Sequence, residues 1–334
     1  MNYLFFRTDR VGDLLVSSIL LKSVKRTNPN NKVFVICSEL NVDFAKNLTF
    51  IDGVFILKKG LFNKIKLLIK INLLKIDKLL ILDGKDRSIF FSFFILAKEK
   101  FYILNKKKMT FFFKSRLENL IFDNENKDTK INIIKKIQHK IGISFFPSDI
   151  NIFNDEIFFH KIDKRKINIL NNIDYNLLHF DEKWIEKLYI KSYKKIELNF
   201  KNLNFFISSM IDKSKMNLVI TSGKNSTKLL EQLKASMTYI GESVYIKKIN
   251  NYSLYFFEMP NFYELIEIIR KTELCITCHG APTHISSSFN VKTIDIIDDS
   301  KISLYRAYSS HLKKYNEVIR VNADVTTKKI LSLL

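Results

Sequence analysis

Glycine, proline and cysteine are scarce in this chain, with 8, 4 and 3 residues among 334. So few breakers leave little material for flexible linkers or a low-complexity tract. Three cysteines give no disulfide framework and fit a reducing compartment. Cys275, Cys278 and His279 match a C-x-x-C-H haem-attachment pattern, but that attachment needs export, and no second cysteine pair completes a zinc site. We therefore expect neither a metal nor another resident cofactor.

Long apolar runs are also missing. The longest, from Ile89 to Ala97, is far shorter than the roughly 20 residues that a helix needs to span a bilayer. Charged residues at positions 7, 9, 10 and 13 interrupt the first apolar run, so we expect no secretory signal. These features predict a cytoplasmic protein, peripheral at most at the inner face of the cytoplasmic membrane.

Acidic residues are outnumbered, since 34 Asp and Glu face 55 Lys and Arg, for a formal net charge of +21 at pH 7. This excess favours anionic partners such as nucleotides, phosphorylated glycans or anionic membrane surfaces. The basic residues are scattered over helical faces such as 58–78, and no arginine-rich arm or nucleic-acid-binding signature is present. We therefore expect no nucleic-acid partner. A basic α/β protein associated with nucleic acid, suggested by charge alone, stays an alternative.

Apolar strand-like and helical segments alternate along most of the chain. We expect strands at 3–7, 33–37, 53–57, 78–83, 101–104, 176–180, 217–221, 244–248, 274–277 and 293–297. With helices between them, this order predicts an α/β fold of two doubly wound, Rossmann-like domains. The expected domains are 1–168 and 169–312, followed by a segment, 313–334, whose helix packs back on the N-terminal domain. No G-x-G-x-x-G or Walker motif is present, which argues against a dehydrogenase or an NTPase.

The opening segment reads as a buried strand, a short polar turn and an amphipathic helix. Ligands of parallel sheets collect at the carboxyl ends of strands, beside the helix starts. The turn therefore places Arg7, Arg10 and Asp13 at the edge where we expect a site. Asp13 also suits a helix cap, because an Asp near a helix start accepts hydrogen bonds from free N–H groups and complements the dipole.

A second candidate element, His279-Gly-Ala-Pro-Thr-His284, opens a helix after the strand at 274–277. Gly280 allows a tight turn, and Pro282 suits the first helical turn because its missing N–H would be unpaired there anyway. Free N–H groups at such a start, together with the helix dipole, favour a phosphate group. The alternative is an ordinary turn with structural histidines.

Three further turns carry candidate residues. Lys183 and Trp184 follow the strand at 176–180, and Trp184, the only Trp, also suits a domain anchor. Ser222 and Gly223 follow the strand at 217–221, where small residues let a ligand approach the backbone.

In the first half, Lys85 and Arg87 follow the strand at 78–83. These two side chains suit either an acceptor phosphate or an ordinary solvated surface.

Two segments resemble the heptosyltransferase-like glycosyltransferases of family nine. Residues 7–24 are similar to the family's start, a strand, a short turn, a Gly-Asp pair and a Leu-rich helix, with the pair at Gly12 and Asp13. Residues 279–284 resemble the family's Asp-Thr-Gly-Pro-x-His element, although His279 takes the place of the Asp. Lys183 beside Trp184 is a weaker match to a Lys-x-Trp signal.

The resemblance implies a GT-B fold, with the active site in a cleft between the domains. It implies an inverting, metal-independent glycosyltransferase that moves a heptose-like sugar from an ADP-linked nucleotide-sugar to an anionic, lipid-linked acceptor, namely lipopolysaccharide or another cell-surface glycan. Asp13 is then the catalytic base, and Lys85 and Arg87 bind the acceptor. The implied donor-binding residues are Arg10, Gly12, Lys183, Ser222, Gly223, His279, Gly280, Ala281, Pro282, Thr283 and His284. A relative that binds a nucleotide or glycan without transferring it stays an alternative, favoured by His279.

Overall fold

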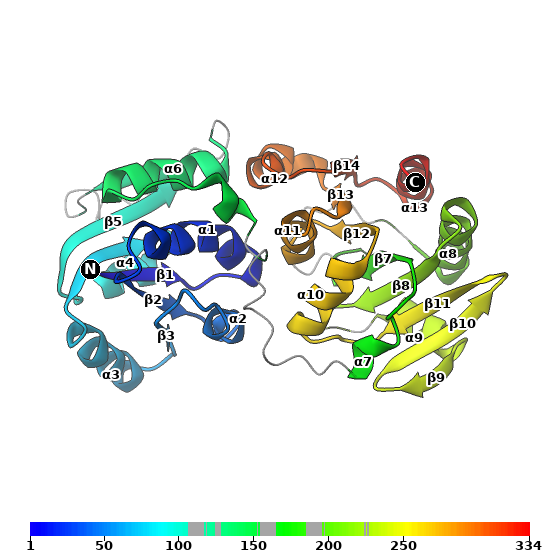
Figure 1. Ribbon diagram of the computed structural model, residues 1–334, viewed down its shortest axis with the longest axis horizontal. Coiled ribbons are helices and arrows are strands. Elements are labelled where there is room, and N and C mark those ends of the chain that lie inside the picture. The colour runs from blue at the N-terminus through cyan, green and yellow to red at the C-terminus, as the bar shows by residue number, and fades with distance from the viewer. Residues whose placement is uncertain are drawn as a thin grey trace. The chain divides into compact units, whose positions relative to one another are not determined.

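The computed structural model describes residues 1–105, 117, 119–123, 128–151, 153, 165–184, 196, 198–223, 225 and 227–334 (Figure 1). The chain divides into two compact units. The first comprises Met1–Phe158 and Arg306–His311, and the second comprises Phe159–Tyr305 and Leu312–Leu334. Each unit has its own sheet (Figure 1).

The first unit contains a parallel sheet with the strand order β3-β2-β1-β4-β5-β6. Its strands are β1 (Asn2–Arg7), β2 (Lys32–Cys37), β3 (Gly53–Ile56), β4 (Ile76–Ile81), β5 (Ala97–Asn105) and β6 (Leu120–Asp123). Its helices are α1 (Val11–Thr27), α2 (Val42–Lys46), α3 (Leu61–Asn72), α4 (Asp86–Ser92), α6 (Lys130–Ile141) and the 3₁₀ turn η2 (Pro147–Ile150). Every strand predicted for this half is present.

The central position of β1 follows from its composition. Residues from Tyr3 to Phe6 are buried, and β1 pairs with β2 on one side and β4 on the other. Large aromatic and branched side chains favour strands, and an unbroken apolar run suits a strand that is covered on both faces. The helix α1 then buries a row of side chains from Leu14 to Leu21. The predicted opening strand and helix are therefore confirmed.

The second unit contains a mixed sheet with the order β14-β13-β12-β7-β8-β11-β10-β9. Its strands are β7 (Tyr175–Phe180), β8 (Asn217–Ser222), β9 (Thr238–Gly241), β10 (Val244–Ile249), β11 (Tyr252–Phe257), β12 (Leu274–Cys278), β13 (Lys292–Ile297) and β14 (Tyr315–Ile319). Its helical elements are α7 (Arg165–Asn168), η4 (Glu182–Trp184), α8 (Phe200–Ser214), α9 (Lys228–Ala235), α10 (Phe262–Lys271), α11 (Ala281–Ser288), η5 (Asp299–Lys301) and α13 (Ala323–Ser332). The helix α12 (Ile302–Ser309) is divided, since its residues from Arg306 onward belong to the first unit.

The edge of this second sheet differs from the prediction of parallel strands. The sequence predicted one strand near 244–248, whereas β9, β10 and β11 form an antiparallel meander there. Its turns use residues with positive φ, including Gly241 and Asn250. Glycine adopts that conformation freely and asparagine tolerates it better than most residues. These turn residues could have indicated the two additional strands, β9 and β11.

The C-terminal segment also differs from the prediction. The helix α13 packs against α8 of the second unit, and its Ile330 is fully buried in that unit's core. The part of the C-terminal region that joins the first unit is Arg306–His311. The second unit begins at Phe159, within ten residues of the predicted boundary at residue 168, and α7 packs on α10 in that unit.

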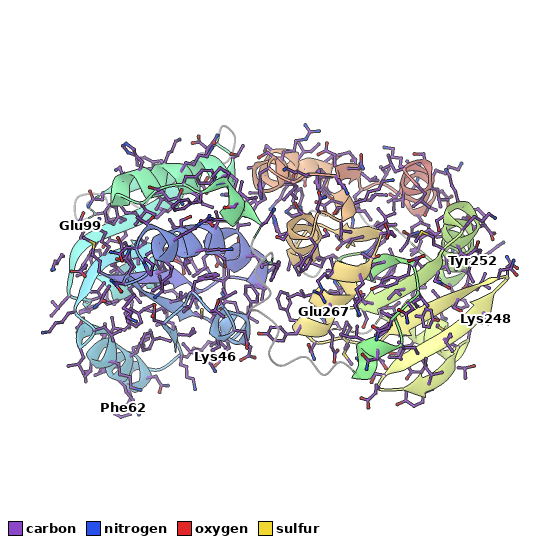
Figure 2. All side chains as sticks on the ribbon, in the orientation of Figure 1. Lys46, Phe62, Glu99, Lys248, Tyr252 and Glu267 are labelled. Atoms are coloured by element: carbon purple, nitrogen blue, oxygen red, sulfur yellow. The ribbon has the colours of Figure 1, made fainter. Side chains whose placement is uncertain are left out.

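Side chains fill the space between the sheet and the helices of each unit (Figure 2). Trp184 lies in the core of the second unit, with its ring stacked 5.1 Å from that of Phe180. Its Nε1 donates to the carbonyl oxygen of His179 at 2.9 Å. Trp184 is therefore a core residue that holds η4 against β7. Among the described residues, no helix has the length and hydropathy that a membrane span requires.

Candidate functional site

The first candidate site lies at the carboxyl ends of β1 and β4. These neighbouring strands mark the point where the strand order reverses, because β2 and β3 extend the sheet on one side and β5 and β6 on the other. Ligands of open α/β sheets bind at such a switch point. Arg10, Asp13, Lys85 and Arg87 all follow these two strands, so the structure brings the four predicted residues to one edge of the first unit.

Asp13 lies in the first turn of α1, where Arg10 is the exposed N-cap residue and Gly12 is half-buried. The Asp13 carboxylate accepts a hydrogen bond from Tyr308 Oη, at 3.0 Å from Oδ1. The same Oδ1 lies 3.6 Å from Arg7 Nη2, and the Asp13 side chain is 27% exposed. Asp13 is thus held in a fixed orientation at the surface of the first unit, and it contacts groups far beyond its own helix turn.

Arg7, at the end of β1, fixes the geometry around Asp13. Its Nε donates to the backbone oxygen of Asp13 at 3.2 Å, and its Nη1 donates to that of Leu82 at 2.7 Å. Nη1 also lies 3.2 Å from the carboxylate of Asp9. Burial alone would lower the pKa of Arg7, but the carboxylates of Asp9 and Asp13 hold it above its ordinary value. Arg7 therefore stays charged and joins the turns after β1 and β4.

The turn after β4 is tied to the turn after β1 through Thr8. The carboxylate of Asp83 accepts from Thr8 Oγ1 at 2.6 Å and from Ser88 Oγ at 2.8 Å. Lys85 Nζ and Arg87 Nη2 donate to the Thr8 carbonyl oxygen at 3.1 and 3.3 Å. Lys85 is half-buried and Arg87 is exposed. Their charges therefore lie at the rim of the Asp13 site.

A cavity of about 140 Å³ lies beside Asp13 in the first unit. Arg7 and Tyr308, the two residues that hold the Asp13 carboxylate, both line it. Leu20, Ile133 and other aliphatic side chains form its apolar wall. An apolar cavity of about 150 Å³ holds a benzene molecule, so this one has room for a single six-membered ring.

The polar wall of the cavity holds Asp9, Asp83, Asp123 and Lys130. Asp9 Oδ1 and Asp123 Oδ1 are buried and have no hydrogen-bond partner among the described residues. Lys130 pairs with Asp123 through the other carboxylate oxygen, Oδ2, and its ammonium lies 4.8 Å from the centre of the Tyr308 ring. Buried acceptors are normally paired. These two oxygens are exceptions: their residues line the cavity, but the oxygens themselves are buried.

In the second unit, Lys183 lies at the carboxyl ends of β7 and β12. Its Nζ donates to the carbonyl oxygens of Cys278 and His279, at 3.1 and 3.0 Å, and lies 2.9 Å from the carboxylate of Asp181. A Cβ on Gly280 would be only 2.8 Å from this Nζ. Gly280 thus leaves room for the ammonium against the β12–α11 turn. The predicted Lys183 and the predicted His279–His284 element are therefore in contact.

The β12–α11 turn is anchored on Asp295 of β13. His279 Nδ1 lies 2.6 Å from Asp295 Oδ2, and Thr283 Oγ1 donates to Asp295 Oδ1 at 3.0 Å. The Gly280 N–H in turn donates to Thr283 Oγ1 at 3.2 Å. A carboxylate is thus present beneath the turn, on the neighbouring strand.

The predicted donor residues of this turn divide into two groups. Pro282, Thr283 and His284 are buried, whereas Gly280 and Ala281 are half-buried. The buried residues shape the turn, and any ligand contacts come from His279, Gly280 and Ala281.

Ser222 and Gly223 lie at the carboxyl end of β8, at the same edge of the second sheet as Lys183. Ser222 Oγ accepts from the Met259 N–H at 2.6 Å. A Cβ on Gly223 would meet Glu182 Oε2 at 2.5 Å and the Cβ of Asp181 at 2.9 Å. Gly223 therefore allows the β8 and β7 turns to approach closely. Glu182 Oε2 is itself buried without a hydrogen-bond partner among the described residues.

Several residues of these sites were not predicted from the sequence. Asp83 lies two residues after β4 and Asp123 ends β6, so their positions at strand ends were an available signal. Tyr308 carried no comparable signal, since it lies 295 residues from Asp13. Lys130 and Asp295 carried none either. Among the described residues, no cluster of three or more metal-ligating side chains is present.

Solved structures of glycosyltransferases share this arrangement of elements. A family 9 glycosyl transferase from Veillonella parvula aligns with a TM-score of 0.65 at 14% identity, over 99% of this chain and 88% of its own. The E. coli heptosyltransferase WaaC with ADP-2-deoxy-2-fluoro heptose aligns with a TM-score of 0.61 at 9% identity, over 100% of both chains. The chain has the heptosyltransferase-like fold. The predicted GT-B architecture is therefore confirmed.

The heptosyltransferase-like fold is also related to that of another nucleotide-sugar enzyme. The UDP-GlcNAc 2-epimerase from Methanocaldococcus jannaschii aligns with a TM-score of 0.55 at 14% identity, over 99% of this chain and 92% of its own. At the sequence level, no family model and no curated protein matches the chain.

Proposed function

We propose that this protein is an inverting, metal-independent glycosyltransferase. It moves a heptose-like sugar from an ADP-linked nucleotide-sugar to an anionic, lipid-linked glycan such as lipopolysaccharide, at the inner face of the cytoplasmic membrane. The observation that carries the proposal is the Asp13 carboxylate, held by Tyr308 and Arg7 beside a ring-sized cavity at the switch point of the first sheet.

Asp13 is the general base of the proposed reaction. The acceptor hydroxyl gives its proton to Asp13 as its oxygen forms a bond to the anomeric carbon. The bond from that carbon to the phosphate oxygen breaks, and the nucleoside diphosphate leaves with the electron pair. Tyr308 and Arg7 both engage Oδ1, so we assign the proton to Oδ2. Attack from the face opposite the leaving group inverts the anomeric configuration.

The cavity beside Asp13 receives the reacting sugar of the acceptor. Its aliphatic wall suits the C–H face of a sugar ring, and the carboxylates of Asp9, Asp83 and Asp123 in its polar wall suit hydroxyl groups. Three carboxylates and two cations line the cavity, so it does not favour an anionic group. We therefore assign the phosphate or carboxylate groups of the acceptor to Lys85 and Arg87 at the rim.

The donor diphosphate is assigned to the second unit, at Lys183 and the β12–α11 turn. Lys183 brings a cation to this turn, and the helix start adds N–H groups that favour negative charge. Developing charge on the leaving group is thereby neutralised by side chains and backbone. We also assign Arg10 to neutralising the negative charge that develops on the leaving diphosphate. The nucleotide-sugars named with the similar structures, ADP-2-deoxy-2-fluoro heptose and UDP-GlcNAc, support this class of donor.

A second function is favoured by His279, which replaces the family's Asp. Its imidazole is bound to Asp295, so the turn offers a ring nitrogen where the family offers a carboxylate. A protein altered in this way can bind a nucleotide-sugar without transferring it. Binding of the donor with neither transfer nor hydrolysis, whatever the acceptor, would select this alternative.

The test is Asp13→Asn, assayed after a thermal-shift panel of ADP-, GDP-, UDP- and CMP-sugars has identified the donor. The variant should bind the donor like the wild type and transfer the sugar at least about 100-fold more slowly, as expected on loss of a general base. Asp43→Asn is the control, because Asp43 is also an acid in the first turn of a helix that follows a strand, at a more exposed position. Transfer by Asp13→Asn at the control's rate would remove Asp13 from the mechanism.

A further inference from the structure

The outer face of α3 exposes a row of large apolar side chains, which are between 46% and 78% exposed. They are Leu61, Phe62, Ile65, Ile69 and Leu73. Positions four apart lie on one side of a helix, so four of these five form a single stripe. Figure 2 shows Phe62 at the periphery of the first unit.

Packing within the first unit does not explain this stripe. The helix is held to the core through Leu67 and Ile71, which are buried on its other side. One apolar face is enough to attach a surface helix. Single exposed apolar residues are common, but a contiguous set marks an interaction surface.

The segment between α4 and β5 extends the stripe. Asn72 Nδ2 donates to the Phe94 carbonyl oxygen at 3.2 Å, and the Leu96 N–H donates to Asn72 Oδ1 at 2.9 Å. The Phe90 and Phe94 rings lie 5.3 Å apart, and both residues are more than half exposed, as is Leu96. We call these side chains together with the stripe the α3 face.

The α3 stripe itself is bordered by positive charge. From residue 58 to residue 75 the chain contains no Asp or Glu. The exposed cations of this stretch are Lys58, Lys59, Lys64, Lys66, Lys70 and Lys75. An apolar stripe bordered by lysines is typical of helices that lie in a membrane interface.

We propose that the α3 face docks on the surface of an anionic lipid bilayer. Its apolar side chains enter the boundary between headgroups and acyl chains, and its lysines contact anionic headgroups. The stripe runs for about 18 Å along the helix, so α3 lies in the plane of the interface. A second copy of this chain would set the same lysines against one another, whereas an anionic bilayer complements both the apolar and the charged groups.

This inference rests on the proposed function only where it concerns a lipid-linked acceptor. Bilayer binding needs no nucleotide-sugar and no transfer, so it is measured separately. Failure of transfer with intact vesicle binding would overturn the proposed function alone, and failure of vesicle binding with intact transfer to a soluble acceptor would overturn this inference alone.

The test is co-sedimentation of the full chain with phosphatidylcholine vesicles that contain or lack phosphatidylglycerol. The variants are Phe62→Gln with Leu73→Gln, and Lys66→Gln with Lys70→Gln. Matched controls on the second unit are Phe205→Gln on α8, which also replaces an exposed Phe, and Lys248→Gln on β10. Circular dichroism melting of each variant confirms that it folds like the wild type.

We expect the wild type and both controls to bind the anionic vesicles, less tightly as salt is raised, and the neutral vesicles at least 10-fold more weakly. Each α3 variant should bind the anionic vesicles at least 10-fold more weakly than its control. Wild-type protein that stays in the supernatant at low salt would overturn the proposal, as would α3 variants that bind like the controls. A wild-type dimer in solution that Phe62→Gln with Leu73→Gln makes monomeric would assign the face to a second copy instead.

Discussion

Tyr308 Oη donates a hydrogen bond to Asp13 Oδ1 at 3.0 Å across a separation of 295 residues. Tyr308 belongs to Arg306–His311, the segment near the C-terminus that joins the first unit. Burial raises the pKa of Tyr308 well above its ordinary value, and the Asp13 carboxylate adds to the shift. The phenol therefore keeps its proton and serves as a donor to Asp13.

Tyr308→Phe should weaken transfer without weakening donor binding. The phenol holds the Asp13 carboxylate and belongs to the first unit, whereas Lys183 and the β12–α11 turn belong to the second. Its loss therefore affects the orientation of the base. We expect kcat to fall by about 10-fold, of the order of one lost hydrogen bond to a charged group, with the donor Kd unchanged. Tyr239→Phe, at an exposed position, is the control. An equal fall in donor affinity would show a structural role instead.

Gly280→Ala and Gly223→Ala should differ in their effect on stability. The new Cβ at Gly280 meets Lys183 Nζ, the end of a flexible side chain that can move. At Gly223 it meets the Cα and Cβ of Asp181 in addition to Glu182 Oε2, so the backbone must shift. Urea unfolding should show a loss of about 1–3 kcal/mol for Gly223→Ala, as for other overpacked sites, and a smaller loss for Gly280→Ala.

Gly280→Ala also tests the donor site. Because this substitution displaces the Lys183 ammonium from the turn, it should lower donor affinity even though the fold is retained. Calorimetric titration with the donor checks this. Wild-type affinity in Gly280→Ala would separate Lys183 from the diphosphate, and a larger stability loss at Gly280 than at Gly223 would contradict the packing account.

His179 should make the second unit sensitive to acid. Burial lowers the pKa of His179 to about 4, against the opposing effect of Asp181. The unfolded chain binds a proton near pH 6.5 that the folded chain does not, so the free energy of unfolding should fall as pH drops from about 6.5 to about 4. The loss is at most about 3.5 kcal/mol, since one pKa unit corresponds to about 1.4 kcal/mol.

Urea unfolding of wild type and His179→Gln at several pH values measures this contribution. Glutamine does not titrate, so the stability difference between wild type and variant should shrink as the pH is lowered through that window. A difference that stays constant from pH 7 to pH 4 would show that His179 takes up its proton equally well in both states.

Asp9 should show the opposite dependence in a similar window. Burial raises the pKa of Asp9 to about 6, Arg7 opposes the shift, and Asp13 and Asp83 add to it while Lys85 lowers it. The folded chain then binds a proton that the unfolded chain releases near pH 4. The contribution of Asp9 to stability is therefore present at low pH and is lost as pH rises from about 4 to about 6.

Asp9→Asn removes this titration. The free energy of unfolding of the wild type minus that of the variant should fall by no more than about 3 kcal/mol between pH 4 and pH 7. Asp52→Asn is a useful contrast, because hydrogen bonds from Lys25, Val33 and Lys32 outweigh burial and lower the pKa of Asp52. If the free energy of unfolding of the wild type minus that of Asp9→Asn rose with pH, the pairing of Asp9 with Arg7 would outweigh the effect of burial on the pKa of Asp9.

Local patterns in the sequence predicted the elements that carry the sites. The apolar run at 3–7 became β1, and the periodic segment after Asp13 became α1. The helix expected between the predicted strands at 244–248 and 274–277 is α10, whose start carries an Asn261–Glu264 capping box. These features depend on residues within one or two helical turns of each other, so a single sequence contains the information. The residues at the ends of those elements could be proposed as site residues for the same reason.

The sequence by itself determined two alternating α/β halves, a carboxylate at the first helix start and a glycine-containing turn after β12, because each is encoded by neighbouring residues. Only the tertiary structure decided that Tyr308 reaches Asp13, that Asp295 anchors His279, that α13 packs on α8, and that Asp9 and Asp123 line one cavity. Those pairings join residues far apart in the chain, and they arise when strand order and helix packing bring distant segments together. No local pattern of charge or hydropathy specifies them.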